Sequence, residues 1–364
     1  MRSSALVPLI VLSAAYAAQA AGGPPSGPPV THFQGSCESD PDGTKFAAKA
    51  CYTVYYPGKS GFGAAYHPPT CAKKTKVTDG QRQILARIYT RAPDYMKAKL
   101  CRLTQLFVTR AEPWGPWGWG FWEGPDRPPG KAVYVAIADR ELDSKKSLAD
   151  AENQTAEQLL GAAERRRSYG PKLQRLRTTD PSDPELAVLG EIAHELGHAL
   201  LADADADGTD PRHPRRKVSG PPRSACFENA FLGASWDPDA FHRRMLRWVD
   251  FGEQYQNRQK NVDAEFSLAR LKAAARGGKL DPANDAISGV FRSKEFVSFG
   301  AAINPVEDFV ETYKYKVLVD ASPKSPVVFR LRNQDIDVTD LLRSGTLEKK
   351  VECLRDLGLL EGAP

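Results

Sequence analysis

The chain contains 364 residues, of which 41% are hydrophobic and 26% charged, with 50 Lys and Arg against 45 Asp and Glu. These fractions are ordinary for a folded soluble protein, and they exclude a fully disordered chain and a protein with many membrane spans. The formal net charge of +5 is small for this length, and the short basic clusters at 165–167 and 215–217 lack interleaved aromatic residues. The composition therefore indicates no nucleic-acid partner.

The first 20 residues have the three parts of a secretory signal peptide. Arg2 supplies a positive start, an apolar run follows over 5–17, and the A-Q-A sequence at 18–20 matches a small-residue cleavage pattern, with a second such pattern at 15–17. The apolar run is too short to span a bilayer. We expect cleavage after Ala20 and an exported protein, periplasmic or secreted, that does not span the membrane.

A Pro- and Gly-rich linker is expected at 21–30, and the region that follows it, 31–110, is rich in cysteine. An even number of cysteines in an exported chain indicates disulfides, although their pairing stays open. Because four of the six cysteines lie in 31–110, we expect that region to be loop-rich and stapled by disulfides. The six are Cys37, Cys51, Cys71, Cys101, Cys226 and Cys353.

Apolar periodicity and helix-breaking residues predict the next elements. The pattern favours a helix over 80–91, a short helix ending near residue 100, and strands over 103–108 and 132–138. Between these strands, 113–130 holds four of the six tryptophans among Gly and Pro residues that forbid a regular helix. We expect a loop there, which either packs its aromatic rings over the edge of the core or forms a substrate-binding lip.

The second half of the chain is predicted to be mostly helical. After a polar helix over 151–167, Asp183 and Pro184 supply the N-cap and the first position of a strong helix over 185–202. Further helices are predicted over 238–250, over 263–276, after Asn304-Pro305 and over 346–355.

The strong helix contains the motif H-E-x-x-H. His194 and His198 are four residues apart, so both rings project from one face and can bind one metal ion. Glu195 follows the first histidine, where it can act as general base on a water whose pKa zinc lowers to about 7. The rest of the helix is apolar, and these polar groups would be costly to bury without a purpose. A chance match on a surface helix is the alternative.

A catalytic zinc site needs a third protein ligand. The metzincin pattern would place Gly and a third His where this chain has Leu201 and Ala204, which excludes that arrangement. The ligand should therefore lie on a later helix, and the candidate segment is 304–313, with Glu307 and Glu311 on one face. An ordinary amphipathic helix with a solvated acidic face is the alternative.

H-E-L-G-H at 194–198, followed by N-P-V-E-D-F-V-E at 304–311, resembles the gluzincin metallopeptidases, in particular the branch similar to the anthrax lethal factor catalytic domain. The resemblance implies that Glu307 is the third zinc ligand. It also implies that Glu311 accepts the second ring N–H of a zinc-binding histidine. Asp308 points about a quarter turn away and is the weaker choice of ligand.

The chain departs from the family at one point. Members often carry a Tyr shortly before Asn-Pro that supports the oxyanion, whereas this chain has Phe299 and Gly300 in that region. The residue that would stabilise the transition state is therefore open. The candidates are Tyr313, Tyr315, His213 and His242.

The expected fold is α+β and zincin-like, with a small sheet that includes 132–138 over the active-site helix and a helical lower half that brings in Glu307. The catalytic domain is expected at 111–320 and a C-terminal extension at 321–364. The resemblance implies that the strand 132–138 and the tryptophan-rich loop border the substrate cleft.

The expected function is hydrolysis of peptide bonds in a peptide or protein substrate, with Zn²⁺ as cofactor. A catalytically degenerate zincin-fold binding or scaffold protein is the alternative, and a secreted, toxin-like protease with one narrow substrate is a third possibility.

Overall fold

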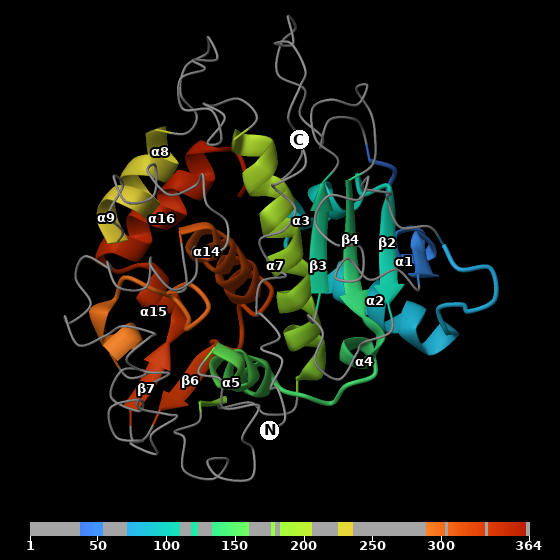
Figure 1. Ribbon diagram of the computed structural model, residues 1–364, viewed down its shortest axis with the longest axis horizontal. Helices are drawn as coiled ribbons and strands as arrows, with labels where there is room; N and C mark the ends of the chain where they lie inside the picture. The colour runs from blue at the N-terminus through green and yellow to red at the C-terminus, as the bar shows by residue number, and fades with distance from the viewer. Residues whose placement is uncertain are drawn as a thin grey trace, which may run out of the picture.

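The computed structural model describes residues 37–53, 71–109, 118–122, 133–159, 176–178, 183–205, 225–235, 289–302, 305–331 and 334–361. These residues form a mixed helix and sheet structure, which confirms the α+β class. A four-stranded sheet and a mostly helical half lie on opposite sides of one long helix, α7 (Pro184–Asp205) (Figure 1). The expected signal peptide, the linker and the helices expected at 238–250 and 263–276 lie outside the described residues.

The four-stranded sheet has the order β1-β2-β4-β3, in which the first three strands run parallel and β3 is antiparallel to β4. Its strands are β1 (Ala50–Thr53), β2 (Gln105–Thr109), β3 (Gly118–Trp122) and β4 (Val133–Ala138). The strands predicted at 103–108 and 132–138 are thereby confirmed. Because β1 and β2 come from 31–110 and the other two strands from 111–320, one sheet joins these two expected regions.

β3 corrects the expectation of a loop over 113–130. Glycine and proline forbid a helix there, but Gly118–Trp122 alternates glycine with aromatic residues and pairs along its whole length with β4. Aromatic residues favour strands, and the neighbouring strand supplies the backbone hydrogen bonds that a loop would lack. The edge of the sheet nearest α7 is therefore β3, and the predicted strand 132–138 lies one place further in.

The helices predicted over 80–91 and ending near residue 100 are confirmed, whereas two short helices in the first 142 residues were not predicted. Thr78 and Gln81 form a reciprocal capping box at the start of α2, which satisfies two backbone N–H groups that the helix leaves open. α5 covers the first part of the helix expected over 151–167, whose remainder lies outside the described residues. The helices are α1 (Thr44–Ala48), α2 (Asp79–Arg91), α3 (Asp94–Leu100), α4 (Asp139–Leu142) and α5 (Leu148–Leu159).

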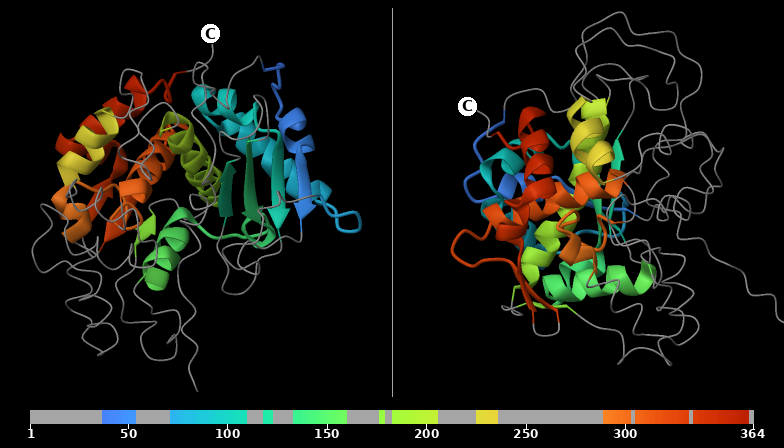
Figure 2. Two further views of the ribbon diagram at one scale, coloured as in Figure 1. Left: turned by 45° about the horizontal axis from the view of Figure 1, so that its top comes forward. Right: turned by 90° about the vertical axis from the view of Figure 1, so that its left-hand side faces the viewer.

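The long helix α7 begins as the sequence predicts. Asp183 accepts the backbone N–H of Leu186 at 3.0 Å, and Pro184 occupies the first helical position, where no N–H is needed. Apolar side chains such as Ile192 and Leu196 are fully buried. The helix packs against β3 and β4 on one side and against α14 (Pro305–Asp320) on the other (Figures 1 and 2).

The other half is built around α14, whose side chains are buried along most of its length. Its acidic face is therefore not the solvated face of an ordinary amphipathic helix. The elements around it include α8 (Ala225–Phe227), a π-helical turn (Glu228–Leu232), α9 (Gly233–Ser235), α15 (Val338–Leu342) and α16 (Gly345–Asp356). A small antiparallel sheet comprises β5 (Arg177–Thr178), β6 (Val328–Leu331) and β7 (Gln334–Asp337).

All six cysteines pair, as Cys37–Cys101, Cys51–Cys71 and Cys226–Cys353. The first pair joins the segment before α1 to the end of α3, the second joins β1 to the segment before α2, and the third joins α8 to α16. Three disulfides in one chain indicate an oxidising compartment.

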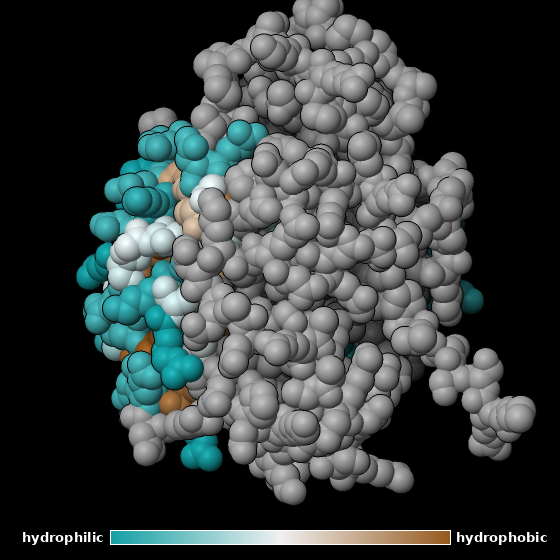
Figure 3. Space-filling view, turned by 60° about the vertical axis from the view of Figure 1, so that its left-hand side comes forward, coloured by the Kyte–Doolittle hydropathy of each residue, from teal (hydrophilic) through white to brown (hydrophobic). Residues whose placement is uncertain are grey.

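The described surface carries mostly polar side chains on the face shown in Figure 3, with apolar residues confined to small spots. Among the described helices, none combines the length and the apolar character needed to cross a bilayer.

α7 and α14 are in close contact at Gly197. A Cβ atom there would lie 3.1 Å from Val310 Cγ1 and 3.3 Å from Val310 Cα, a backbone atom that cannot move unless α14 moves. At Gly190, on the same helix, the nearest atom would be the flexible Lys314 Cε at 3.4 Å.

We expect Gly197→Ala to lower the free energy of unfolding by up to about 2 kcal/mol, because overpacking of about 1–3 kcal/mol exceeds the helix-propensity gain of about 1 kcal/mol. The matched control, Gly190→Ala, should keep that gain. Thermal and urea unfolding of the metal-free protein measure both. Equal gains in the two variants would show that the helices have room to separate.

Candidate metal centre

His194 and His198 of α7 face Glu307 of α14 across the contact between the two helices. One ligand atom from each residue lies within 4.8 Å of the other two. His194 Nε2 is 3.5 Å from one carboxylate oxygen of Glu307, and His198 Nε2 is 3.7 Å from the other. A tetrahedral zinc ion places its ligand atoms about 3.4 Å apart, so these separations match its geometry.

The cluster depends on two local patterns and one tertiary contact. The four-residue spacing of the histidines puts both on one face of α7, and their rings lie 5.0 Å apart at 80°. Glu307 lies in the first turn of α14, two residues after Pro305. Only the packing of α14 on α7 brings the carboxylate opposite the rings.

His198 offers a ring nitrogen that suits a metal ion. Its Nε2 is buried and has no hydrogen-bond partner within the part of the chain that the structure describes. Burial, together with the charge of His194, lowers the pKa of His198 to about 3, so the ring is neutral at physiological pH. A buried ring nitrogen without a hydrogen bond is costly, and a bound metal ion would satisfy it.

Glu311 contacts the ring nitrogen of His194 that does not face Glu307. This nitrogen, Nδ1, lies 2.7 Å from Glu311 Oε1. Burial raises the pKa of Glu311, but the Lys314 ammonium and the His194 hydrogen bond outweigh it and lower that pKa to about 2. Because an ionised carboxylate only accepts hydrogen bonds, Nδ1 must donate, which directs Nε2 toward Glu307. Ser298 Oγ donates to the second oxygen of Glu311 at 2.5 Å.

The three candidate ligands differ in how readily they give up a proton. Burial lowers the pKa of His194, but its hydrogen bond to Glu311 and the surrounding carboxylates raise it to about 10. Burial raises the pKa of Glu307 to about 7, although the neighbouring His194 charge opposes the shift. Without a metal ion, His194 is therefore protonated on both ring nitrogens and positively charged at neutral pH, and Glu307 is about half ionised.

The other residues singled out from the sequence take varied positions. Glu195 is only 2% exposed, and its charge acts on the adjacent His194. Asp308 turns away from the cluster and pairs with Lys350 of α16 at 2.6 Å, with both side chains fully buried. It is therefore not placed to act as a metal ligand.

The two tyrosine candidates lie in buried aromatic contacts. Tyr313 meets Tyr95 edge-on at 6.4 Å, and Tyr315 meets Phe329 at 5.9 Å. Both tyrosines are fully buried, so neither hydroxyl is placed to contact a substrate in this conformation. The histidine candidates at 213 and 242 lie outside the described residues.

Sequence reasoning missed the residues that support Glu311. Lys314 lies one turn after Glu311 on the same face of α14, a spacing that could have identified it. Ser298 and Glu152 come from other segments, and no local signal connects them with the site.

No family model, no curated protein and no solved structure matches this chain. The chemistry inferred for the centre therefore rests on its own geometry.

We expect the purified mature protein to bind about one zinc ion per chain and Glu307→Ala to lose it, because two histidines alone leave the site incomplete. Elemental mass spectrometry after dialysis measures this. Glu348→Ala, at an exposed position on α16, is the control and should keep the metal. Equal zinc in the Glu307 and Glu348 variants would contradict the three-ligand centre.

Zinc affinity should rise with pH, because the ion needs His194 neutral and Glu307 ionised. From pKa values of about 10 and about 7, binding at pH 8 displaces mainly the proton of His194, whereas at pH 6 Glu307 must also lose one. Calorimetry in two buffers of different ionisation enthalpy should show more protons released per ion at pH 6 than at pH 8. Affinity and proton release that do not change over this range would contradict the assignment of these ligands.

Proposed function

We propose that this chain is an exported, zinc-dependent peptidase with a zincin-like fold, similar to the gluzincins. The observation that carries the proposal is the meeting of His194, His198 and Glu307 within 4.8 Å, with Glu195 directly after the first histidine. Export is supported by the signal-like first 20 residues and by the three disulfides.

In this proposal His194, His198 and Glu307 hold the metal. A zinc ion in such a site lowers the pKa of a water to about 7 and polarises a substrate carbonyl. Glu195 accepts the proton of the attacking water and donates it to the leaving amine. Glu311 keeps the His194 ring in the orientation that directs Nε2 to the cluster.

The edge strand favours a peptide as substrate. β3 pairs with β4 on one side, and no other described strand pairs with its second side. β3 also packs against α7, the helix that carries both histidines. An extended peptide can add to such an edge through main-chain hydrogen bonds, which places successive peptide bonds along the strand. We therefore propose β3, rather than the strand 132–138, as the strand that binds substrate.

A zinc-stabilised binding protein on the same fold is the second candidate. The specific observation in its favour is the burial of Tyr313 and Tyr315, the two tyrosines that the sequence offered for stabilising an oxyanion. This candidate has a metal centre and binds peptides but does not turn them over.

We expect Glu195→Gln to keep zinc and to lose peptide hydrolysis by about 10²–10⁴-fold, because the amide cannot accept the proton of the water. The assay is cleavage of a mixed peptide library by the mature protein, with zinc content measured on the same samples.

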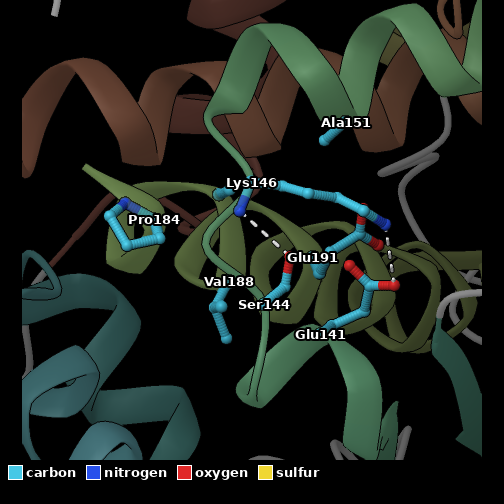
Figure 4. A pocket seen from close by; sticks show the side chains of 8 residues that line it. Glu141, Ser144, Lys146, Ala151, Pro184, Val188 and Glu191 are labelled. Carbon is cyan, nitrogen blue, oxygen red and sulfur yellow. Dashed lines mark hydrogen bonds and ion pairs between the residues drawn. The ribbon is translucent and has the colours of Figure 1, made fainter. Parts of the chain in front are cut away.

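Glu191→Gln is the matched control. Glu191 lies one turn earlier on α7 and lines a small pocket with Glu141, Ser144 and Lys146 (Figure 4). It should keep the wild-type rate. Full activity in Glu195→Gln would refute the mechanism, and a zinc-loaded wild-type protein that cleaves no peptide would favour the binding protein.

A further inference from the structure

A buried chain of charged side chains extends behind His194, beyond the groups that the proposed hydrolysis uses. Lys314 Nζ of α14 donates to Glu152 Oε1 of α5 at 2.7 Å and to the two oxygens of Glu311 at 3.2 and 3.3 Å. The three side chains are at most 7% exposed. The connection therefore runs from α5, through α14, to the metal-facing histidine of α7.

Each N–H group of the Lys314 ammonium has a carboxylate oxygen to donate to in this position. The ammonium has three N–H donors, and three carboxylate oxygens lie within reach of them. Burial lowers the pKa of Lys314, but Glu152 and Glu311 outweigh it and raise that pKa well above the usual range. Lys314 is therefore a permanent cation in contact with both oxygens of Glu311.

Glu311 in turn has every direction of its carboxylate occupied. His194 and Lys314 contact Oε1, while Ser298 and Lys314 contact Oε2. Gly300 closes in on the same carboxylate, because a Cβ there would lie 3.1 Å from Glu311 Cδ. Four hydrogen bonds therefore hold the Glu311 carboxylate, and one of them holds the His194 ring.

Burying this many charges is a poor way to gain stability. Taking a lysine and two carboxylates out of water costs several kcal/mol per ion, and well-packed apolar side chains of similar volume often stabilise a fold as well or better. A role other than stability therefore explains this arrangement better. The Glu311–His194 hydrogen bond connects it to the proposed metal site.

We propose that Lys314 is a positioning residue for the metal centre, which fixes Glu311 so that Glu311 can hold the His194 ring toward the ion. Glu152 anchors Lys314 from α5, 162 residues away in the sequence. The inference rests on the proposed zinc site, but not on peptide hydrolysis.

The test compares zinc affinity among variants of the full mature chain. The variants are Lys314→Met, the double variant Lys314→Met/Glu152→Met, and Lys350→Met. The last is the matched control: Lys350 is also a fully buried lysine paired with a carboxylate of α14, but its partner Asp308 faces away from the cluster. Competition with a chromophoric chelator gives the zinc Kd, thermal unfolding of the metal-free protein gives stability, and the visible spectrum of the cobalt-loaded protein reports ligand geometry.

We expect Lys314→Met to bind zinc about tenfold more weakly and to alter the cobalt spectrum, because supports of metal ligands typically contribute about 10–100-fold. Lys350→Met should lose thermal stability but keep its zinc Kd within about twofold. The double variant should regain stability, since it leaves no unpaired carboxylate at Glu152, while its zinc affinity stays low. If Lys314→Met alone does not fold, the double variant carries the test.

Wild-type zinc affinity in the Lys314 variants would overturn the inference. So would a loss of zinc affinity in Lys350→Met equal to that in Lys314→Met, or a return of zinc affinity in the double variant. Because the readout is zinc binding, these outcomes are separate from the proposed function. A chain that binds zinc through Lys314 as described, but cleaves no peptide, overturns only the peptidase proposal.

Discussion

The close packing of α14 on α7 is the contact on which the rest of the site depends. At Gly197 the helices approach until a single added methyl group would press on the backbone of Val310. This approach sets the distance between the paired histidines on one helix and Glu307 on the other. Each helix alone carries an incomplete set of ligands, and a small separation would take the ligand atoms beyond the reach of one ion. The candidate centre is thus a property of the interface between two halves of the fold.

The second constraint is the burial of charge along α14. Glu307, Asp308, Glu311 and Lys314 lie within two turns of a helix that is almost wholly enclosed. Each has a charged or ionisable partner: Asp308 meets Lys350, Lys314 meets Glu152, and the two glutamates meet His194 of α7. Buried charges persist only when they are paired or hold a metal. Among the described residues, the buried Nε2 of His198 has no hydrogen-bond partner, which makes it the ring nitrogen best placed to accept an ion beside Glu307.

The local features of the fold were largely predictable. Asp183 and Pro184 begin α7 as an N-cap and first-turn proline should, and Pro305 begins α14 in the same manner. The strand β4 follows from a continuous β-branched and apolar run. β3 was missed because glycine between aromatic residues indicates a loop when read locally, and its strand character comes from pairing with β4. For the same reason the sequence did not show that one sheet includes strands from both 31–110 and 111–320.

What the sequence determined by itself is the ligand pattern within each helix. The helical repeat of 3.6 residues puts His194 with His198, and Glu307 with Glu311, whatever surrounds them. Tertiary structure alone decided the rest: that the carboxylate of Glu307 lies beside the histidines, that Glu152 reaches Lys314 across 162 residues, and which cysteines pair. The rotation of α14 about its axis selects which carboxylate points at α7. That rotation is set by the apolar side chains packed around the helix, which no short stretch of sequence contains.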